Sequence, residues 1–255
     1  MLTEARLAMS AAQAREMLAA ARARPDLITQ VVPAPFSFAA DAMIQHLIAD
    51  GYIGELQAVD LHASAGFLPQ DATMTWRTDR ELSGMNVMFM GIWYECLMRW
   101  VGPATAVTAR TRVAVPYRRD PDTGLRRATT VPDHVEALAD LANGAIARLH
   151  IGAVAGLMPG PEAWIYGSEG TLRFEQQGAR LSGARRGATA LEPIAIPPDK
   201  HYEWRVEEEF VSAIRGTEKI TRTTFEDGVR YMDFTEAVTV SSREGRTVQL
   251  PLGDP

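Results

Sequence analysis

The feature that most constrains the fold is the segment from Ser83 to Gly102, SGMNVMFMGIWYECLMRWVG. Its apolar residues recur at helical spacing, and bulky side chains occupy many of the other positions. The pattern therefore predicts a helix that is buried around most of its circumference. The polar side chains on it are few: Asn86, Tyr94, Glu95 and Arg99. A helix of this kind must sit in the middle of other elements, and it either lines a site or fills a core.

The segments before this helix follow the order of an α/β unit. Ser10 to Gln13 has the form of a capping box, which predicts a helix that Pro25 ends. Residues 27–32 predict a short strand, and a second helix is expected from about Ala39 to a glycine cap at Gly51. The order helix, strand, helix is that of an α/β unit that lacks its beginning.

The segments after the helix are mostly strands joined by turns. Asn143-Gly144 predicts a hairpin with a type I′ turn, and GSEG at 167–170 predicts a second tight turn. The expected strands are 55–65, 104–115, 135–141, 145–151, 163–166, 171–175 and 248–252. Helices return at 204–214 and 225–242, the second opened by a capping box of Thr224 and Asp227. The fold class is therefore α+β, with one large open, mainly antiparallel sheet and helices on one face.

Composition excludes several classes of protein. The chain has 255 residues and a net charge of −6, and its Lys/Arg runs are no longer than pairs, which argues against nucleic acid as a partner. Cys96 is its one cysteine, which excludes an internal disulfide and fits a reducing compartment. The sequence shows neither an export signal nor a long apolar run, so we expect a cytoplasmic protein without a membrane partner.

Motifs for cofactors and metals are missing. The chain contains no G-x-G-x-x-G and no P-loop, and its five histidines are scattered without zinc-type spacing, so no metal site is predicted. Asp133-His134 with Glu136 is the one tight His/carboxylate cluster; a polar strand start is the favoured interpretation, and an acid/base pair of an isomerase or dehydratase is the alternative. Cys96 lies in an apolar helix, which predicts an inert packing residue.

Several segments together resemble the Gfo/Idh/MocA family of oxidoreductases. They are WIYGSEGTLRFE (164–175), FVSAIRG (210–216) and TFEDGVRYMDFTEAVTVSSREGRTVQLPL (224–252), and the resemblance covers nearly the whole chain. It implies an N-terminal Rossmann domain that binds NAD(P) and a C-terminal α+β domain. The open sheet of that second domain forms the substrate pocket and commonly the interface between subunits.

The resemblance also predicts where this chain departs from its family. TEAR, at residues 3–6, stands in the place of the E-K-P motif, so Glu4 matches while Ala5 and Arg6 replace the lysine and the proline. Most of the Rossmann domain would then precede Met1. We expect residues 1–34 to be the remnant of a truncated nucleotide-binding domain and residues 35–255 to be the C-terminal domain, with NAD(P) implied by the family although its binding fingerprint is absent from this chain.

The central helix lacks the catalytic pattern D-x-G-x-H that the family commonly carries there. Aligning its glycine on Gly91 puts Phe89 and Trp93 at the Asp and His positions, and neither exchanges protons at neutral pH. Tyr94 is then the candidate catalytic proton donor, with a half-buried packing aromatic as the alternative. The candidate substrate-binding residues are Glu4, Arg77, Asn86 and Trp93.

Two functions are compatible with this pattern. The first is a divergent, truncated oxidoreductase whose full form transfers hydride between NAD(P) and a sugar-like or polyol-like substrate, while this chain alone is inactive. The second is a non-catalytic domain that binds a substrate or forms a homo-oligomer through its open sheet.

Overall fold

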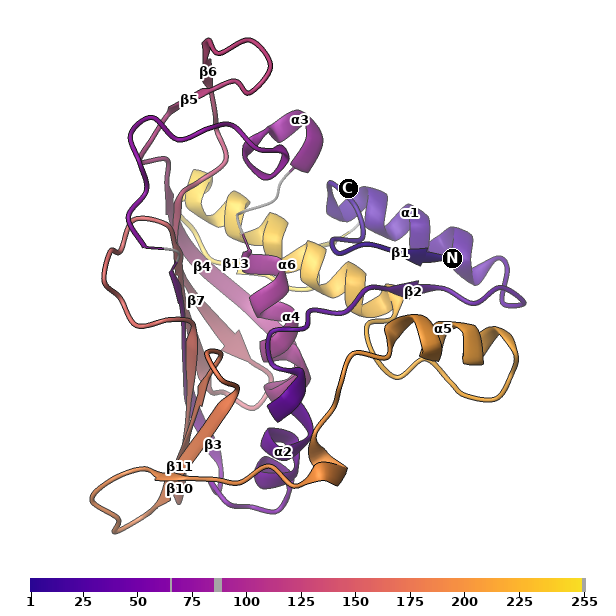
Figure 1. The fold of residues 1–255 in the computed structure, drawn as a ribbon, viewed down its shortest axis with the longest axis vertical. Coiled ribbons are helices and arrows are strands. Elements are labelled where there is room, and N and C mark those ends of the chain that lie inside the picture. Colours follow the sequence, from indigo (N-terminus) through magenta and orange to yellow (C-terminus); the bar gives the residue numbers. More distant parts are fainter. Residues whose placement is uncertain (65, 85–88, 254–255) are drawn as a thin grey trace.

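The computed structural model describes residues 1–64, 66–84 and 89–253, and these residues build one large sheet of nine strands (Figure 1). The strand order is β12-β11-β10-β9-β3-β8-β7-β4-β13, in which β3 and β8 are parallel and the other neighbours are antiparallel. The strands are β3 (Leu56–Ser64), β4 (Ala104–Arg112), β7 (His134–Leu141), β8 (Ile146–Gly152), β9 (Glu162–Gly167), β10 (Gly170–Glu175), β11 (Arg180–Arg185), β12 (Glu192–Pro193) and β13 (Val248–Gln249). The predicted fold class is confirmed.

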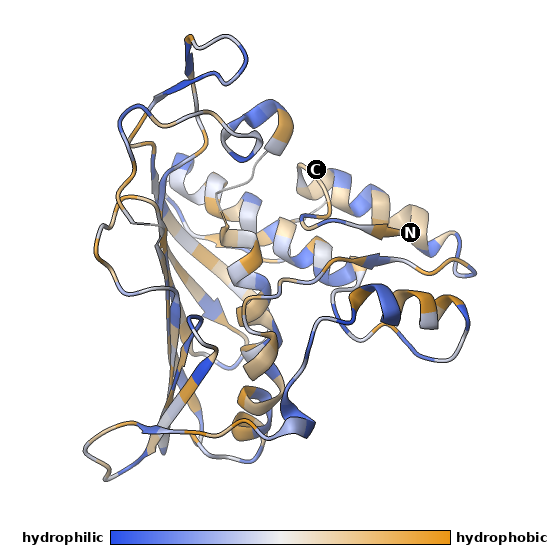
Figure 2. Ribbon diagram, in the orientation of Figure 1, coloured by the Kyte–Doolittle hydropathy of each residue, from blue (hydrophilic) through white to orange (hydrophobic). Residues whose placement is uncertain are grey.

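Three helices cover one face of this sheet: α2 (Phe38–Ala49), α4 (Met90–Val101) and α6 (Phe225–Glu244) (Figure 1). Strand residues alternate between the two faces, so Val59 and Leu61 are buried against the helices while Asp60 and His62 lie on the other face. We call this second face the open face. Helix α4 is hydrophobic along most of its length (Figure 2), and its core position confirms the expected burial.

The predicted central helix is shorter than the sequence suggested. A separate short helix, α3 (Arg80–Ser83), ends at Gly84, whose φ is +59°, and α4 begins only at Met90. A Cβ at Gly84 would lie 2.1 Å from the carbonyl oxygen of Met9, so only glycine permits this close approach. The candidate Asn86 lies outside the described residues.

The N-terminal elements form a small β-α-β unit apart from the large sheet. Strands β1 (Leu2–Thr3) and β2 (Gln30–Val31) pair in parallel, and α1 (Ala11–Arg22) connects them (Figure 1). The Ser10 side chain caps α1 by accepting a hydrogen bond from the Gln13 amide, as predicted, but the Gln13 side chain accepts from the Met9 amide and not from that of Ser10, so the predicted capping box is only half formed. Strand β2 confirms part of the predicted strand, whereas β1 is too short to show any periodicity.

The C-terminal elements confirm most expectations. Thr224 and Asp227 form the predicted capping box of α6, and Gly245 ends that helix in the left-handed conformation. Helix α5 (Val206–Ile214) and the hairpin of β9 and β10 also agree. The predicted last strand stops early, at β13, before Pro251. A small hairpin, β5 (Tyr117–Arg119) with β6 (Arg126–Ala128), was not predicted.

The turn between β7 and β8 differs from the predicted type. Gly144 has a φ of +85°, but Asn143 is not among the residues with positive φ, so the turn is not type I′. The Leu141 amide donates to the Ala145 carbonyl at 2.9 Å, which encloses a loop of three residues. This loop sets the register in which Glu136 faces His150. None of the helices in the described part of the chain is long and apolar enough to cross a lipid bilayer.

Candidate functional site

A cleft of about 500 Å³ lies where the connection from β1 to α1 meets the 3-10 turn Trp76–Thr78 and α3. Its lining includes Glu4, Arg6, Gln13, Glu16, Trp76 and Leu82. The structure thus places Glu4, a predicted substrate-binding residue, on the wall of a cleft. Arg77 lies beside it, because its guanidinium stacks on the Trp76 ring with Cζ 4.3 Å from the ring centroid.

Arg6 is the cation that sequence reasoning missed. Its Nη1 donates to the Ser83 carbonyl at 2.7 Å, and its Cδ would lie 4.0 Å from a Cβ at Gly91, at the start of α4. Burial lowers the pKa of Arg6 to about 10, against the raising effect of Tyr231, while Arg77 lowers it further. From the sequence, Arg6 was interpreted only as a departure from the E-K-P motif. The signal that could have identified it as a candidate site residue is that a basic residue stands within that motif.

Trp93 and Tyr94 lie in the core. Trp93 is 2% exposed and its ring centroid is 4.9 Å from that of Phe36. The Tyr94 ring stacks on Phe234 at 3.7 Å, and its hydroxyl accepts a hydrogen bond from the Ala104 amide at 2.8 Å. Burial raises the pKa of the Tyr94 phenol well above its usual range. The structure therefore does not bring these two candidates to the cleft with Glu4, and their roles as site residues stay predictions.

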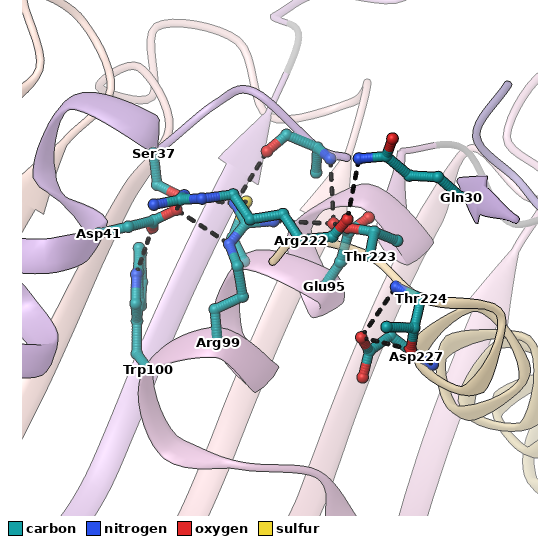
Figure 3. A network of polar contacts seen from close by, with 12 residues as sticks. Gln30, Ser37, Asp41, Glu95, Arg99, Trp100, Arg222, Thr223, Thr224 and Asp227 are labelled. Atoms are coloured by element: carbon teal, nitrogen blue, oxygen red, sulfur yellow. Dashed lines mark hydrogen bonds and ion pairs between the residues drawn. The ribbon is translucent and has the colours of Figure 1, made fainter. Parts of the chain in front are cut away.

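A buried network of charged side chains occupies the helical face of the sheet (Figure 3). Its centre is Asp41 on α2, which accepts a hydrogen bond from Trp100 Nε1 at 2.7 Å. Asp41 Oδ2 lies 2.9 Å from Arg99 Nε and 3.0 Å from Arg222 Nη1. Two arginines thus share one buried carboxylate.

Glu95 on α4 extends this network toward the N-terminal unit. It pairs with Arg99 at 2.8 Å and accepts hydrogen bonds from the Ala34 amide at 3.0 Å and from the Thr223 hydroxyl. Burial raises the pKa of Glu95, and Arg99 with these hydrogen bonds opposes that rise. The network joins α2, α4, the chain after β2 and the loop before α6, so we interpret it as a structural connection. Cys96, in the same helix, is fully buried, which raises its pKa to about 12 and agrees with the predicted packing role.

The N-terminus of α1 does not fit the pyrophosphate of a dinucleotide. In a β-α-β unit the phosphates lie at the helix N-terminus, where free amides point at them. At α1 the Ala11 amide already donates to Glu236 Oε2 at 2.9 Å, and the Met9 amide donates to Gln13 Oε1 at 3.1 Å. A carboxylate thus lies where a pyrophosphate would, and the chain has no glycine-rich turn there.

The structure does not bring Asp133 and His134 together as an acid/base pair. Asp133 is buried, pairs with Arg118 and accepts hydrogen bonds from two backbone amides. His134 instead faces Glu136, with its Nε2 3.4 Å from Glu136 Oε1. The two neighbours therefore point to different partners.

Comparison with known proteins decides the family. The model of the GFO/IDH/MocA C-terminal domain matches residues 42–173, about half of the chain. The chain belongs to the GFO/IDH/MocA family. The resemblance read from the sequence is thus confirmed, and the matched GFO/IDH/MocA segment includes α4 and Trp76.

Solved structures share this GFO/IDH/MocA fold at low identity. An NAD binding oxidoreductase from Klebsiella pneumoniae has a TM-score of 0.85 and 21% identity, covering 99% of this chain and 74% of that one. Levoglucosan dehydrogenase in complex with NADH and L-sorbose has a TM-score of 0.85 and 18% identity, covering 98% and 73%. The transcriptional regulator Gal80p from Kluyveromyces lactis has a TM-score of 0.76 and 19% identity, covering 97% and 66%. No curated protein matches the sequence.

Proposed function

We propose that this chain is the substrate-binding part of a GFO/IDH/MocA oxidoreductase and that its cleft binds a sugar-like or polyol-like ligand. The observation that carries the proposal is Arg6, a partly buried cation that shares the cleft with Glu4 and Trp76. A carboxylate and a guanidinium suit the hydroxyl groups of such a ligand, and an exposed indole suits its flat apolar face. The relative levoglucosan dehydrogenase, in complex with L-sorbose, supports this class of ligand.

The proposal includes a nucleotide-binding part that residues outside this sequence supply. Residues 1–34 would be the last elements of a Rossmann domain, and residues 35–255 the family's C-terminal domain. The β-α-β unit supports this division, because parallel sheets are normally larger and covered on both faces. An apolar groove of about 470 Å³ lies beside α1, and Leu27 and Ile214 on it are 53% and 61% exposed. In the full form, NAD(P) supplies the hydride chemistry, while the cleft orients the sugar-like or polyol-like substrate.

The second candidate is a non-catalytic binding or oligomerisation domain. Two observations favour it: Phe89 at the N-cap of α4 and Trp93 within α4 stand where the family pattern carries proton-exchanging groups, and the Tyr94 hydroxyl is bonded to backbone. The Gal80p relative, a transcriptional regulator, shows the same fold. The open face exposes Leu138 and Ile146 by about half, 52% and 51%, which fits contact with a second copy of the chain.

Calorimetric titration of the purified chain with L-sorbose, levoglucosan, inositol, NADH and NADPH separates these candidates. We expect saturable binding of at least one polyhydroxylated ligand and none of either dinucleotide. Dinucleotide binding would contradict the placement of the cofactor site outside this sequence. Absence of binding to every sugar and polyol, with a dimer or larger species by light scattering, would instead support the oligomerisation domain.

A further inference from the structure

The open face of the sheet carries three side chains of the metal-ligating type close together. His134 and Glu136 lie on β7 and His150 lies on β8, and one ligand atom from each is within 4.8 Å of the others. We propose that these three side chains bind a divalent transition-metal ion, with Zn²⁺ as the best fit. This face is opposite the one that α4 covers, so the metal site is separate from the cleft.

Strand pairing brings the three residues together. His134 and Glu136 are two residues apart on β7 and therefore project from the same face. In the antiparallel register Glu136 faces His150, and His134 faces Gly152. A Cβ at Gly152 would lie 2.9 Å from His134 Nδ1, so the missing side chain leaves room for the His134 ring.

The distances are close to those of a coordination shell. Glu136 Oε1 lies 2.6 Å from His150 Nδ1 and 3.4 Å from His134 Nε2. Ligand atoms bound to tetrahedral zinc at its usual bond lengths lie about 3.3 Å from each other. One of the two distances already fits, and the other needs a shift of less than about 1 Å, which a side-chain rotation supplies.

The cluster is incomplete as a set of hydrogen bonds. Both imidazoles converge on the same carboxylate oxygen, and His134 Nδ1 and His150 Nε2 are buried without a hydrogen-bond partner in the described part of the chain. The two unpartnered nitrogens point away from Glu136, and an ion between the ligand atoms would not contact them. What favours an ion is that the other nitrogen of each ring converges on the same oxygen, Glu136 Oε1. An ion between the three ligand atoms would bind the nitrogen of each ring that faces Glu136 and fix the proton on the other nitrogen.

The donor set determines the class of ion. Two imidazoles and one carboxylate suit Zn²⁺, or a metal such as Fe²⁺ or Co²⁺, better than Mg²⁺ or Ca²⁺, which prefer oxygen ligands throughout. Side-chain exposures of 23% for His134, 12% for His150 and 45% for Glu136 leave the site reachable from solvent. Three protein ligands leave a fourth position open to water.

The test is calorimetric titration of the chelator-treated, metal-free chain with ZnCl₂, followed by thermal unfolding with and without zinc. We expect one Zn²⁺ per chain and a higher Tm with zinc, because an ion that binds the folded state stabilises it. His150→Ala and the nearly isosteric Glu136→Gln should each weaken binding at least about tenfold and remove the rise in Tm.

His46→Ala is the matched control, since His46 is an exposed histidine on α2 far from this cluster in sequence. Two results would overturn the proposal. One is that His46→Ala reduces zinc uptake as strongly as His150→Ala does, and the other is that the wild-type protein takes up no zinc. Circular dichroism checks that each variant folds, and Glu136→Gln keeps the test valid if His150→Ala does not. Zinc binding unchanged in Arg6→Ala would show that this site is independent of the cleft.

Discussion

The buried network around Asp41 and the cleft around Arg6 use the same side-chain types in opposite ways. In the network each charge has partners, with Arg99 and Arg222 on Asp41 and several donors on Glu95. In the cleft, Arg6 bonds only to a carbonyl oxygen, and within the described residues neither Arg6 nor Glu4 forms an ion pair. Satisfied charges hold elements together, whereas unsatisfied charges beside a cavity are available to a ligand.

Removing the centre of the network should have the largest effect on stability. Asp41→Ala takes the paired carboxylate from the buried Arg222 and leaves Arg99 paired with Glu95 alone, which should cost about 3–5 kcal/mol of unfolding free energy. Urea denaturation measures this loss. Asp26→Asn is the control, because the Asp26–Arg24 pair is exposed and screened by solvent, so its loss should leave the urea midpoint almost unchanged. Equal losses in the two variants would contradict the structural role of the network.

Gly84→Ala should damage the wall of the cleft. Its φ of +59° and the 2.1 Å approach of a Cβ to the Met9 carbonyl predict a loss of about 2–3 kcal/mol and weaker ligand binding. Gly187→Ala is the control that measures only the cost of placing a Cβ at positive φ, because Gly187 also has positive φ but has open space around it. This variant should lose about 1 kcal/mol of unfolding free energy. A similar loss in both variants would show that the contact with Met9 is unimportant.

Tyr94→Phe should have a modest effect on stability alone. It removes the acceptor of the buried Ala104 amide, which should cost about 1–2 kcal/mol in urea denaturation. Ligand affinity should not change, because the hydroxyl points to backbone. A loss of sugar binding without loss of stability would restore Tyr94 as a site residue.

The smallest effect is the pH dependence of ligand binding. With the pKa of Arg6 lowered to about 10, its charge is complete at pH 8 and falls at higher pH. Affinity for the sugar-like ligand should therefore decrease as the pH rises past about 10, where Arg6 loses its charge. The contribution of Arg6 to folding stability should instead increase as the pH rises above about 10, because in that range the unfolded chain binds more protons at this residue than the folded chain does. The Arg6→Ala variant should lose the pH dependence of binding.

The fold was largely predictable because its signals are local. The capping box of Thr224 and Asp227, the Asn143-Gly144 turn and strand alternation each act over a few residues. The gap between α3 and α4 was not predictable, because it depends on Gly84 packing against Met9, far away in sequence.

The sites were less predictable because they depend on long-range placement. A type I′ turn implies a register shifted by one residue, in which His150 would not face Glu136. The three-residue loop that brings them together cannot be recognised from Asn143-Gly144 alone. Arg6 was likewise missed, because its approach to Ser83 and Gly91 connects distant segments.

The most direct test of the central claim, that the cleft binds ligand through Arg6, is a paired titration of Arg6→Ala and Arg186→Ala. The ligand is whichever sugar or polyol the wild-type chain binds, and Arg186 is an exposed arginine with 70% of its side chain accessible. The account predicts a loss of about 10-fold to 100-fold in affinity for Arg6→Ala, since a charged hydrogen bond contributes about 1.5–3 kcal/mol, and no change for Arg186→Ala. Wild-type affinity in a folded Arg6→Ala variant would contradict the account.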